Sequence, residues 1–194
     1  MFSPEGEFEG RYDKMKLVPF GEYIPLRDAL PFLQVFTPMT RELTPGDRPV
    51  VFTLPGEGEE VGLGPLICYE DVFPSLTRAF RRKGADVLVN LTDEGWYRIP
   101  GELGQHLAMA VFRAVETRTS VVRAANTGIS CFIGPRGEIY ARLKPHHEGA
   151  LAAHVRLCKA STPYVRHGDV FAIACLVLSL AALGTLAALR RRGV

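Results

Sequence analysis

The chain has 194 residues, of which 47% are hydrophobic and 9% aromatic, which predicts one domain, or one domain plus an appendage, with a sizeable core. Its formal net charge is only +2, and the basic residues are scattered except at the extreme C-terminus. This excludes the clustered Lys/Arg face of a nucleic-acid-binding protein. The cysteines form no CxxC pair and no zinc-ligand spacing with the five histidines, so we expect no metal site and no cofactor; they are Cys68, Cys131, Cys158 and Cys175.

The N-terminal quarter of the chain contains few signals of regular structure. Residues 11–18 fit a short strand that opens into the loop PFGEYIP (19–25), where two prolines and a glycine act as breakers. Residues 26–48 form a long, proline-punctuated segment. Long loops are usually functional or disordered, and an apolar loop is less typical of disorder. The apolar residues of this segment are Leu26, Leu30, Phe32, Leu33, Val35, Phe36 and Met39.

From residue 49 on, strand and helix signals alternate. PVVFTL (49–54) and VGLGPLIC (61–68) predict two strands joined by the turn PGEGEE. A helix follows, with Pro74 in its first turn and its end at Lys83 and Gly84. DVLVNLT (86–92) is a short, continuous apolar run typical of a fully buried strand. A second helix is expected over 102–118, where apolar residues recur at helical spacing.

The part of the chain after residue 118 predicts closely spaced strands, with a hairpin turn at Gly137. The strand–helix–strand–helix–strand order indicates an α/β layer architecture in which helices pack on a sheet. The predicted strands are SVVRAAN (120–126), ISCFIG (129–134), EIYARL (138–143) and ALAAHVRL (150–157).

Residues 170–189, VFAIACLVLSLAALGTLAAL, contain no charged residue. A helix of this length spans about 30 Å, the hydrocarbon thickness of a bilayer. A buried helix of a soluble domain is the alternative, but such helices rarely run this long without a polar face. Three arginines follow, so by the positive-inside rule the C-terminus is cytoplasmic. We predict a linker over 161–169, a transmembrane helix over 170–189 and a cytoplasmic basic tail over 190–194.

A domain on the outer face of a membrane requires an export signal. Residues 1–10, MFSPEGEFEG, have neither a basic n-region nor an apolar h-region. We therefore expect this chain to be the C-terminal part of a longer protein.

Three stretches carry candidate chemistry. GPLICYED (64–71) ends an apolar run on Cys68, although a cysteine in that position is by itself most often a core residue. YDKMKLVPFGEYIP (12–25) contains Lys14, which alone would be a solvated surface charge. NLTDEGWY (90–97) follows a strand with two acids and Trp96. None of the three decides a function alone.

Taken together, the three stretches resemble the nitrilase, or carbon–nitrogen hydrolase, superfamily, and within it the C-terminal part of the apolipoprotein N-acyltransferase family. The resemblance covers about residues 2–157 and the terminal helix. It implies a nitrilase-like αββα sandwich, of which residues 1–160 would form a partial catalytic domain. It also implies a bacterial inner-membrane enzyme, multi-pass in its full length, with the catalytic domain on the periplasmic side.

The resemblance implies a role for each matching residue. Cys68 matches the nucleophile, Lys14 the catalytic lysine and Glu22 a structural or assisting glutamate. An ammonium near a thiolate stabilises it and faces the developing oxyanion, and the Tyr69 backbone N–H offers a second oxyanion donor. Tyr69 and Glu70 match positions beside the nucleophile, Trp96 matches a tryptophan of a loop beside the site, and Arg118 and Asn126 match structural positions.

The reaction implied is ping-pong acyl transfer from a phospholipid, through a cysteine thioester, to the N-terminal amine of a diacylglyceryl-cysteine apolipoprotein. The family's general-base glutamate lies many tens of residues before the lysine, whereas Glu5 precedes Lys14 by only nine residues. We therefore leave Glu5 unassigned and expect the base upstream of Met1. The isolated chain is then expected to associate with membranes without transferring an acyl group.

Two alternatives remain. One is a nitrilase-superfamily hydrolase of a soluble amide or nitrile, against which the terminal span and the apolar 26–39 segment argue. The other is a non-catalytic membrane-anchored fragment, which the missing base and missing export signal favour for this polypeptide alone.

Overall fold

The computed structural model describes every residue except 37–41, 57, 98–99 and 192–194. Its six strands form one sheet in the order β1-β2-β3-β4-β5-β6, with the neighbours along the chain also neighbours in the sheet. The pairs β2–β3 and β3–β4 are parallel, and the other three pairs are antiparallel. The strands are β1 (Phe52–Pro55), β2 (Glu60–Ile67), β3 (Val87–Thr92), β4 (Ser120–Ala125), β5 (Cys131–Ile133) and β6 (Ile139–Arg142).

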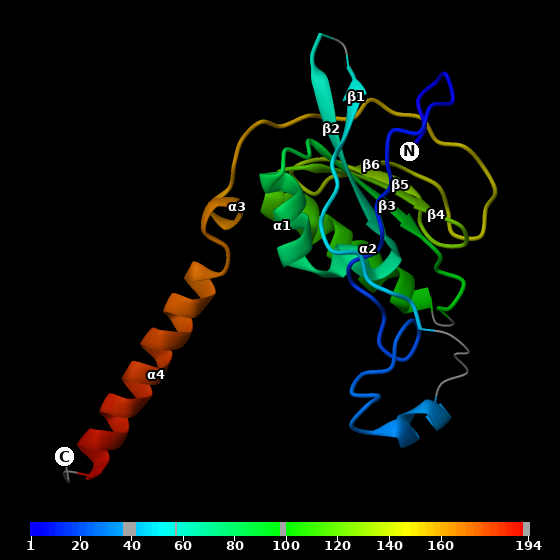
Figure 1. Cartoon of the computed structure of the whole chain (residues 1–194). Helices are drawn as coiled ribbons and strands as arrows, with labels where there is room; N and C mark the ends of the chain where they lie inside the picture. Colours follow the sequence, from blue (N-terminus) through cyan, green and yellow to red (C-terminus); the bar gives the residue numbers. More distant parts are fainter. Residues whose placement is uncertain (37–41, 57, 98–99, 192–194) are drawn as a thin grey trace.

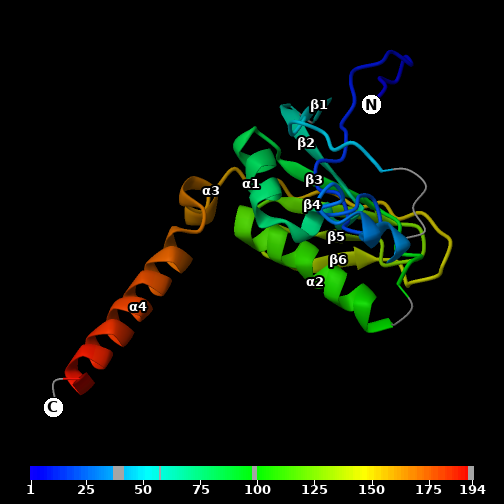
Figure 2. The same cartoon turned by 60° about the horizontal axis from the view of Figure 1, so that its bottom comes forward.

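Two α-helices make the crossovers that parallel strands require, and both cover the same face of the sheet (Figure 2). α1 begins at a proline, which suits a first turn, and Gly84 after its end has a φ of +98°, which a glycine adopts without strain. The helical elements of the described residues are α1 (Pro74–Arg82), α2 (Pro100–Thr117), α3 (Pro163–His167), α4 (Val170–Arg191) and the 3₁₀ helices η1 (Pro31–Phe36) and η2 (Cys68–Val72).

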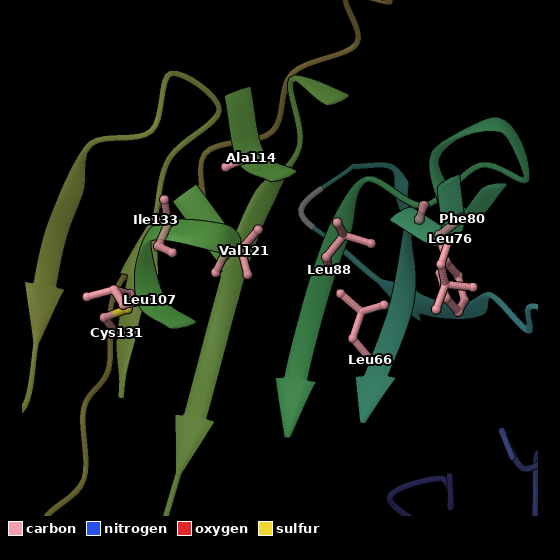
Figure 3. Packing of buried hydrophobic residues seen from close by; sticks show 11 residues of the cluster. Leu66, Leu76, Phe80, Leu88, Leu107, Ala114, Val121, Cys131 and Ile133 are labelled. Atoms are coloured by element: carbon pink, nitrogen blue, oxygen red, sulfur yellow. The ribbon is translucent and has the colours of Figure 1, made fainter. Parts of the chain in front are cut away.

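The hydrophobic core lies between the sheet and these two helices. Figure 3 shows Leu66 and Leu88 of neighbouring strands near Leu76 and Phe80 of α1. It also shows Val121 of β4 near Leu107 and Ala114 of α2. Leu66, Leu88 and Phe80 are completely buried. The predicted α/β layer architecture is therefore confirmed, and burial of such side chains contributes roughly 1.5–3 kcal/mol each.

The strand predicted over residues 11–18 is wrong. This segment is irregular because its backbone amides bind a side chain instead of a neighbouring strand. The amides of Met15 and Lys16 both donate to the carboxylate of Glu70, at 2.7 and 3.0 Å. Lys14 therefore lies on an anchored loop rather than on a surface strand.

The strand predicted over residues 150–157 is also wrong. The carbonyl of His154 accepts a hydrogen bond from the Tyr140 hydroxyl, and that of Arg156 accepts one from Ser120. Farther along, the Cys158 carbonyl accepts one from Arg81. These side chains tie the segment to α1, β4 and β6, and it has no regular secondary structure, so Cys158 lies outside any strand.

In the apolar segment predicted as a long loop, the described residues contain one short element, η1. Its two ends are held together near the sheet: Ile24 N donates to Glu42, and Leu43 N donates to the Glu22 carbonyl, both at 2.9 Å. Between these ties, Phe32 and Val35 are 60% and 85% exposed. Met39, which was counted among the apolar residues of the segment, lies outside the described residues.

α4 extends away from the sheet (Figure 1) and is the only helix of the described residues that is long and apolar enough to cross a membrane, with a mean hydropathy of 2.5 over an 18-residue window of Val170–Arg190. The short helix α3 precedes it and lies within the segment 161–169. α3 is joined to α1 by Arg78, whose guanidinium donates to the carbonyls of Tyr164 and Val165 at 2.9 and 3.1 Å. α4 thus starts from an element attached to the domain.

Candidate active site

Cys68 is the first residue of η2, at the sharp turn that follows β2. Its φ of +53° lies in the left-handed region, which is rare for a residue other than glycine and costs roughly 1–3 kcal/mol. Two contacts hold the turn: Asn90 Nδ2 donates to the Cys68 carbonyl at 3.0 Å, and Ile67 N donates to Glu70 Oε2 at 2.8 Å. The turn carries the thiol beyond the end of β2, in which Gly64 and Leu66 are buried, and leaves Cys68 partly exposed.

Cys68 opens onto a cleft of about 580 Å³ at the C-terminal ends of the parallel strands. In open α/β sheets, ligands bind at this edge. Residues from four separate segments meet in the cleft, and three of the predicted site residues join Cys68 there. The lining includes Lys14, Glu22, Cys68, Asp93, Trp96 and Asn126.

Lys14 and Glu22 form an ion pair in the wall of this cleft. Lys14 Nζ lies 2.6 Å from Glu22 Oε1, and the lysine side chain is only 9% exposed. The other oxygen of Glu22 accepts a hydrogen bond from Val18 N at 2.9 Å. Because both carboxylate oxygens are engaged, Glu22 orients the ammonium, and two of the three ammonium hydrogens remain for other partners.

Glu70 does not line the cleft but anchors the segment that carries Lys14. It is fully buried and accepts from Tyr12 Oη at 2.8 Å and from the amides of Met15, Lys16 and Ile67. Burial and the neighbouring carboxylate raise the pKa of Tyr12 far above its usual range, so its hydroxyl remains a donor. One carboxylate thus joins the Cys68 turn to the lysine loop.

Replacing Glu70 by Gln is expected to destabilise the domain by about 1–3 kcal/mol for each donor left without an acceptor. The amide nitrogen that replaces one carboxylate oxygen cannot accept a hydrogen bond. It would place two donor hydrogens against the N–H and O–H donors that surround Glu70. Urea denaturation of the detergent-solubilised chain measures the loss. Glu60→Gln, an exposed acid of β2, is the matched control and should change stability by less than about 0.5 kcal/mol. Equal stability of the two variants would contradict this assignment.

Tyr69 and Trp96 take different positions beside Cys68. The Tyr69 ring leaves the cleft and packs edge-on against Phe73, with ring centroids 5.8 Å apart. It lines a smaller pocket of about 200 Å³ together with Tyr97 and Met109. Only the Tyr69 backbone N–H stays beside the nucleophile position. Trp96 is 83% exposed at the mouth of the cleft.

Behind the cleft lies a buried set of charged side chains that the sequence analysis did not assign. Arg123 Nη1 donates to Asp71 Oδ2 at 2.6 Å, and its Nη2 donates to Glu94. His106 lies between the same two carboxylates, with Nε2 2.7 Å from Asp71 Oδ1 and Nδ1 2.7 Å from Glu94 Oε1. We call Asp71, Glu94, His106 and Arg123 the charge cluster; each is at most 4% exposed.

One sequence signal could have revealed this cluster. Arg123 stands inside the apolar strand SVVRAAN, and a buried arginine requires carboxylate partners. Arg118, predicted as structural, lies elsewhere and donates to the Pro135 carbonyl at 3.4 Å. Asn126 contacts the loop after β3, since its Nδ2 donates to Asp93 Oδ1 at 2.7 Å. Glu5 is exposed in the N-terminal loop and does not line the cleft.

Two pKa values in the cluster are shifted in opposite directions. Burial alone would lower the pKa of His106, but its hydrogen bonds to Asp71 and Glu94 outweigh that effect and raise it above 6.5. Burial alone would raise the pKa of Glu94, but the hydrogen bond to His106 and the charge of Arg123 lower it. Both shifts favour the charged cluster, in which two cations balance two carboxylates.

The stability of the domain is expected to fall as the pH rises above neutrality. A histidine whose pKa is raised on folding stabilises the protein fully below its unfolded pKa of about 6.5, and this contribution is lost as the pH passes the folded pKa. Urea denaturation at a series of pH values from below 6.5 upward measures the free energy of unfolding as a function of pH. His106→Gln should flatten the pH dependence, whereas the exposed His147→Gln should not. The same slope in both variants would show that His106 is not responsible.

Comparisons with known proteins agree on one family. A model of the carbon–nitrogen hydrolase family matches residues 1–161. The chain is 41% identical to apolipoprotein N-acyltransferase of Geobacter metallireducens over its whole length, covering 36% of that protein. It is 33% identical to apolipoprotein N-acyltransferase 2 of Treponema pallidum over 93% of this chain and 33% of that protein. The chain thus spans about a third of the length of these relatives.

Solved structures agree with the fold. A nitrilase-superfamily protein of Saccharomyces cerevisiae superposes with a TM-score of 0.55 at 22% identity, over 76% of this chain and 48% of that one. An amidase from Nesterenkonia sp. superposes with a TM-score of 0.52 at 24% identity, over 76% of this chain and 50% of that one. At these identities the likeness concerns the nitrilase-type fold alone.

Proposed function

Because the chain belongs to the carbon–nitrogen hydrolase family, we propose that its cleft transfers an acyl chain from a phospholipid, through a thioester on Cys68, to the amine of a diacylglyceryl-cysteine apolipoprotein. The observation that carries the proposal is the convergence of the Cys68 thiol and the Lys14 ammonium on one cleft. The names of the relatives support transfer of an acyl group to a nitrogen of an apolipoprotein, and the phospholipid donor comes from the resemblance of the sequence motifs.

In the first half-reaction, the Cys68 thiolate attacks the ester carbonyl of the phospholipid. The oxyanion that forms is stabilised by the Lys14 ammonium and by the Tyr69 backbone N–H. A donor that is placed in advance for such a charge is typically worth about 10²–10³ in rate. The ester C–O bond then breaks, the leaving alcohol takes a proton, and the acyl group remains on sulfur as a thioester.

In the second half-reaction, the N-terminal amine of the apolipoprotein attacks the thioester carbonyl. The same two donors stabilise the second oxyanion. The C–S bond breaks, the amine loses a proton as the amide forms, and the Cys68 thiol is regenerated. Trp96, exposed at the mouth of the cleft, is positioned to contact the incoming chains.

Both half-reactions need a general base, and we propose that it comes from the region of the relatives that residues 1–194 do not span. Two carboxylates of the described residues line the cleft, and each is held in place by hydrogen bonds or an ion pair. Glu22 binds Lys14 and Val18 N, and Asp93 Oδ1 accepts from Asn126 and Gly95 N. General acid–base assistance contributes about 10²–10⁴ in rate, so the isolated chain is expected to transfer no acyl group.

The membrane location follows the same proposal. α4 would span the bilayer over residues 170–189, the catalytic domain would lie on the periplasmic side, and the basic tail would be cytoplasmic. The exposed apolar side chains of Leu26, Leu30, Phe32 and Val35 would rest at the lipid interface, near the acyl donor. A tethered domain suits a reaction in which both substrates are anchored in lipid.

The proposal is tested with a chimera in which residues 1–194 replace the matching third of the Geobacter metallireducens relative. Phospholipid vesicles and a diacylglyceryl-cysteine peptide are supplied, and mass spectrometry follows the acyl chain. We expect an acyl-thioester on the Cys68 peptide, discharged onto the acceptor amine. Release of free fatty acid without amide formation would favour a hydrolase, and robust turnover by residues 1–194 alone would place the base within this chain.

A further inference from the structure

Two of the four segments that meet in the cleft come from distant parts of the chain and continue behind it, and we call them walls. The elbow wall, residues 68–72, carries Cys68. The loop wall, residues 93–97, carries Asp93 and Trp96. Between them the Cys68 thiol donates a long hydrogen bond to the Asp93 carbonyl, with sulfur and oxygen 3.9 Å apart. Such a contact is too weak to fix the separation of the walls.

The charge cluster supplies a stronger connection directly behind the cleft. Asp71 belongs to the elbow wall and Glu94 to the loop wall. Two planar groups bridge these carboxylates in parallel, the guanidinium of Arg123 from β4 and the imidazole of His106 from α2. Because both bridging groups are rigid, the distance between the two walls is set by their size rather than by flexible side chains.

The loop wall is also held from its other side. Glu94 Oε2 accepts a hydrogen bond from Ile129 N at 3.2 Å. A Cβ added to Gly128 would lie 1.5 Å from the same oxygen, so Glu94 fills the space that a side chain at 128 would need. Glu94 therefore cannot move away from Arg123 and His106 toward the β4–β5 connection.

A buried charge cluster of this kind is poor evidence for stability, because apolar side chains of the same volume often stabilise as well or better. We therefore expect the charge cluster to fix the position of the two walls relative to each other. We propose that the charge cluster is a positioning unit that keeps Cys68 in register with the loop that carries Trp96. This inference rests on the proposed acyl transfer. The cluster acts through the walls, and a misplacement of about 1 Å can cost on the order of 10² in rate.

The test compares two reactions of Cys68 in the full 194-residue chain in detergent. Iodoacetamide requires only a reactive thiol, whereas a long-chain p-nitrophenyl ester must enter the cleft and place its carbonyl against Lys14. The activated ester reacts with the small thiolate fraction present near neutral pH, so it needs no general base, and the assay avoids the higher pH at which His106 loses its proton. Peptide mass spectrometry assigns each product to its cysteine. In His106→Gln and Arg123→Lys, we expect acylation to fall about 10–100-fold and alkylation to change less than about threefold.

Two further variants separate positioning from loss of stability. Gly128→Ala keeps all four charged side chains but displaces Glu94, and it should reproduce the selective loss of acylation. Ile133→Val removes a methyl group from the core and lowers stability, and it should leave the ratio of the two rates unchanged. Labelling of the buried Cys131 reports general unfolding. An unchanged ratio in His106→Gln, Arg123→Lys and Gly128→Ala would overturn the inference.

Hydrogen exchange gives a readout that does not depend on the proposed chemistry. If the cluster couples the walls, the amides of 68–72 and of 93–97 should exchange faster together in His106→Gln, while those of β5 stay protected. Exchange that changes in one wall alone, or in neither, would overturn the inference. Failure of the wild-type chain to form an acyl-thioester on Cys68 would instead contradict the proposed function, and the exchange data would still decide the coupling.

Discussion

Replacing Cys68 by Ser or Ala is expected to abolish acyl transfer in the chimera described above, with a loss of at least about 10³-fold. The nucleophile forms the covalent intermediate, so no other group of the cleft can complete the first half-reaction. The acyl-thioester on the Cys68 peptide should disappear with the activity. The strained turn at residue 68 should persist, because Asn90 and Glu70 hold its backbone rather than its sulfur.

The other three cysteines are the controls. Cys131 is 1% exposed, and burial raises the pKa of its thiol to about 11, so it supplies almost no thiolate at neutral pH. Cys158 lies near the far end of the sheet, and Cys175 lies in α4. Replacing any of them by Ala should change transfer by less than about threefold. An acyl-thioester on a Cys131 or Cys158 peptide would refute the assignment of Cys68.

Replacing Lys14 by Arg is expected to reduce acyl transfer nearly as much as Lys14→Ala, by about 10²–10³-fold. The ammonium is a compact charge that fits 2.6 Å from Glu22 in a wall that leaves it only 9% exposed. A planar guanidinium spreads its charge and needs more space, so it cannot occupy the same point. Transfer to the diacylglyceryl-cysteine peptide is the measurement, with urea denaturation to show that the domain stays folded.

Lys16 provides the matched control for this substitution. It lies two residues away on the same loop, with its ammonium 5.8 Å above the Phe73 ring and outside the cleft lining. An arginine makes the same cation–π contact, so Lys16→Arg should keep near-normal activity. Near-normal activity in Lys14→Arg as well would reduce Lys14 to a wall charge with no part in oxyanion stabilisation.

The central layer of the fold was predictable because its signals are local. The strand found at Val87–Thr92 is a continuous apolar run, and the helix found at Pro74–Arg82 is marked by a proline at its start and Lys-Gly after its end. Each of these patterns fixes an element without reference to the rest of the chain. The predicted second helix, 102–118, is likewise confirmed within two residues at Pro100–Thr117.

The two strand predictions that failed depend on contacts that a local pattern does not contain. Residues 11–18 have suitable composition, but their amides bind a carboxylate more than 50 residues away in the sequence. Residues 150–157 have suitable alternation, but side chains of distant elements take their carbonyls. Strand propensity describes a fit to a pleated surface, and among the described residues no neighbouring strand pairs with either segment.

Some residues of the candidate site were likewise predictable from the sequence, and others were not. Cys68, Lys14 and Trp96 were predicted as site residues because they stand in motifs that resemble those of a family. The structure brings all three to one cleft. The charge cluster joins residues 12 to 52 positions apart, and neither Asp71 nor His106 stands out in its own segment. Only the burial of Arg123 in an apolar strand hinted at partners, without saying which carboxylates they would be.

The left-handed backbone at Cys68 also matters for engineering the protein. Glycine adopts this conformation at no steric cost. At residue 68 the stability of the fold therefore favours glycine, whereas the proposed reaction requires cysteine. If variants of this protein were selected only for a higher melting temperature, those with glycine at residue 68 would be enriched and the thiol would be lost. Directed evolution of this scaffold must therefore select for turnover from the first round, because a stability screen removes the reactive group before any assay detects the loss.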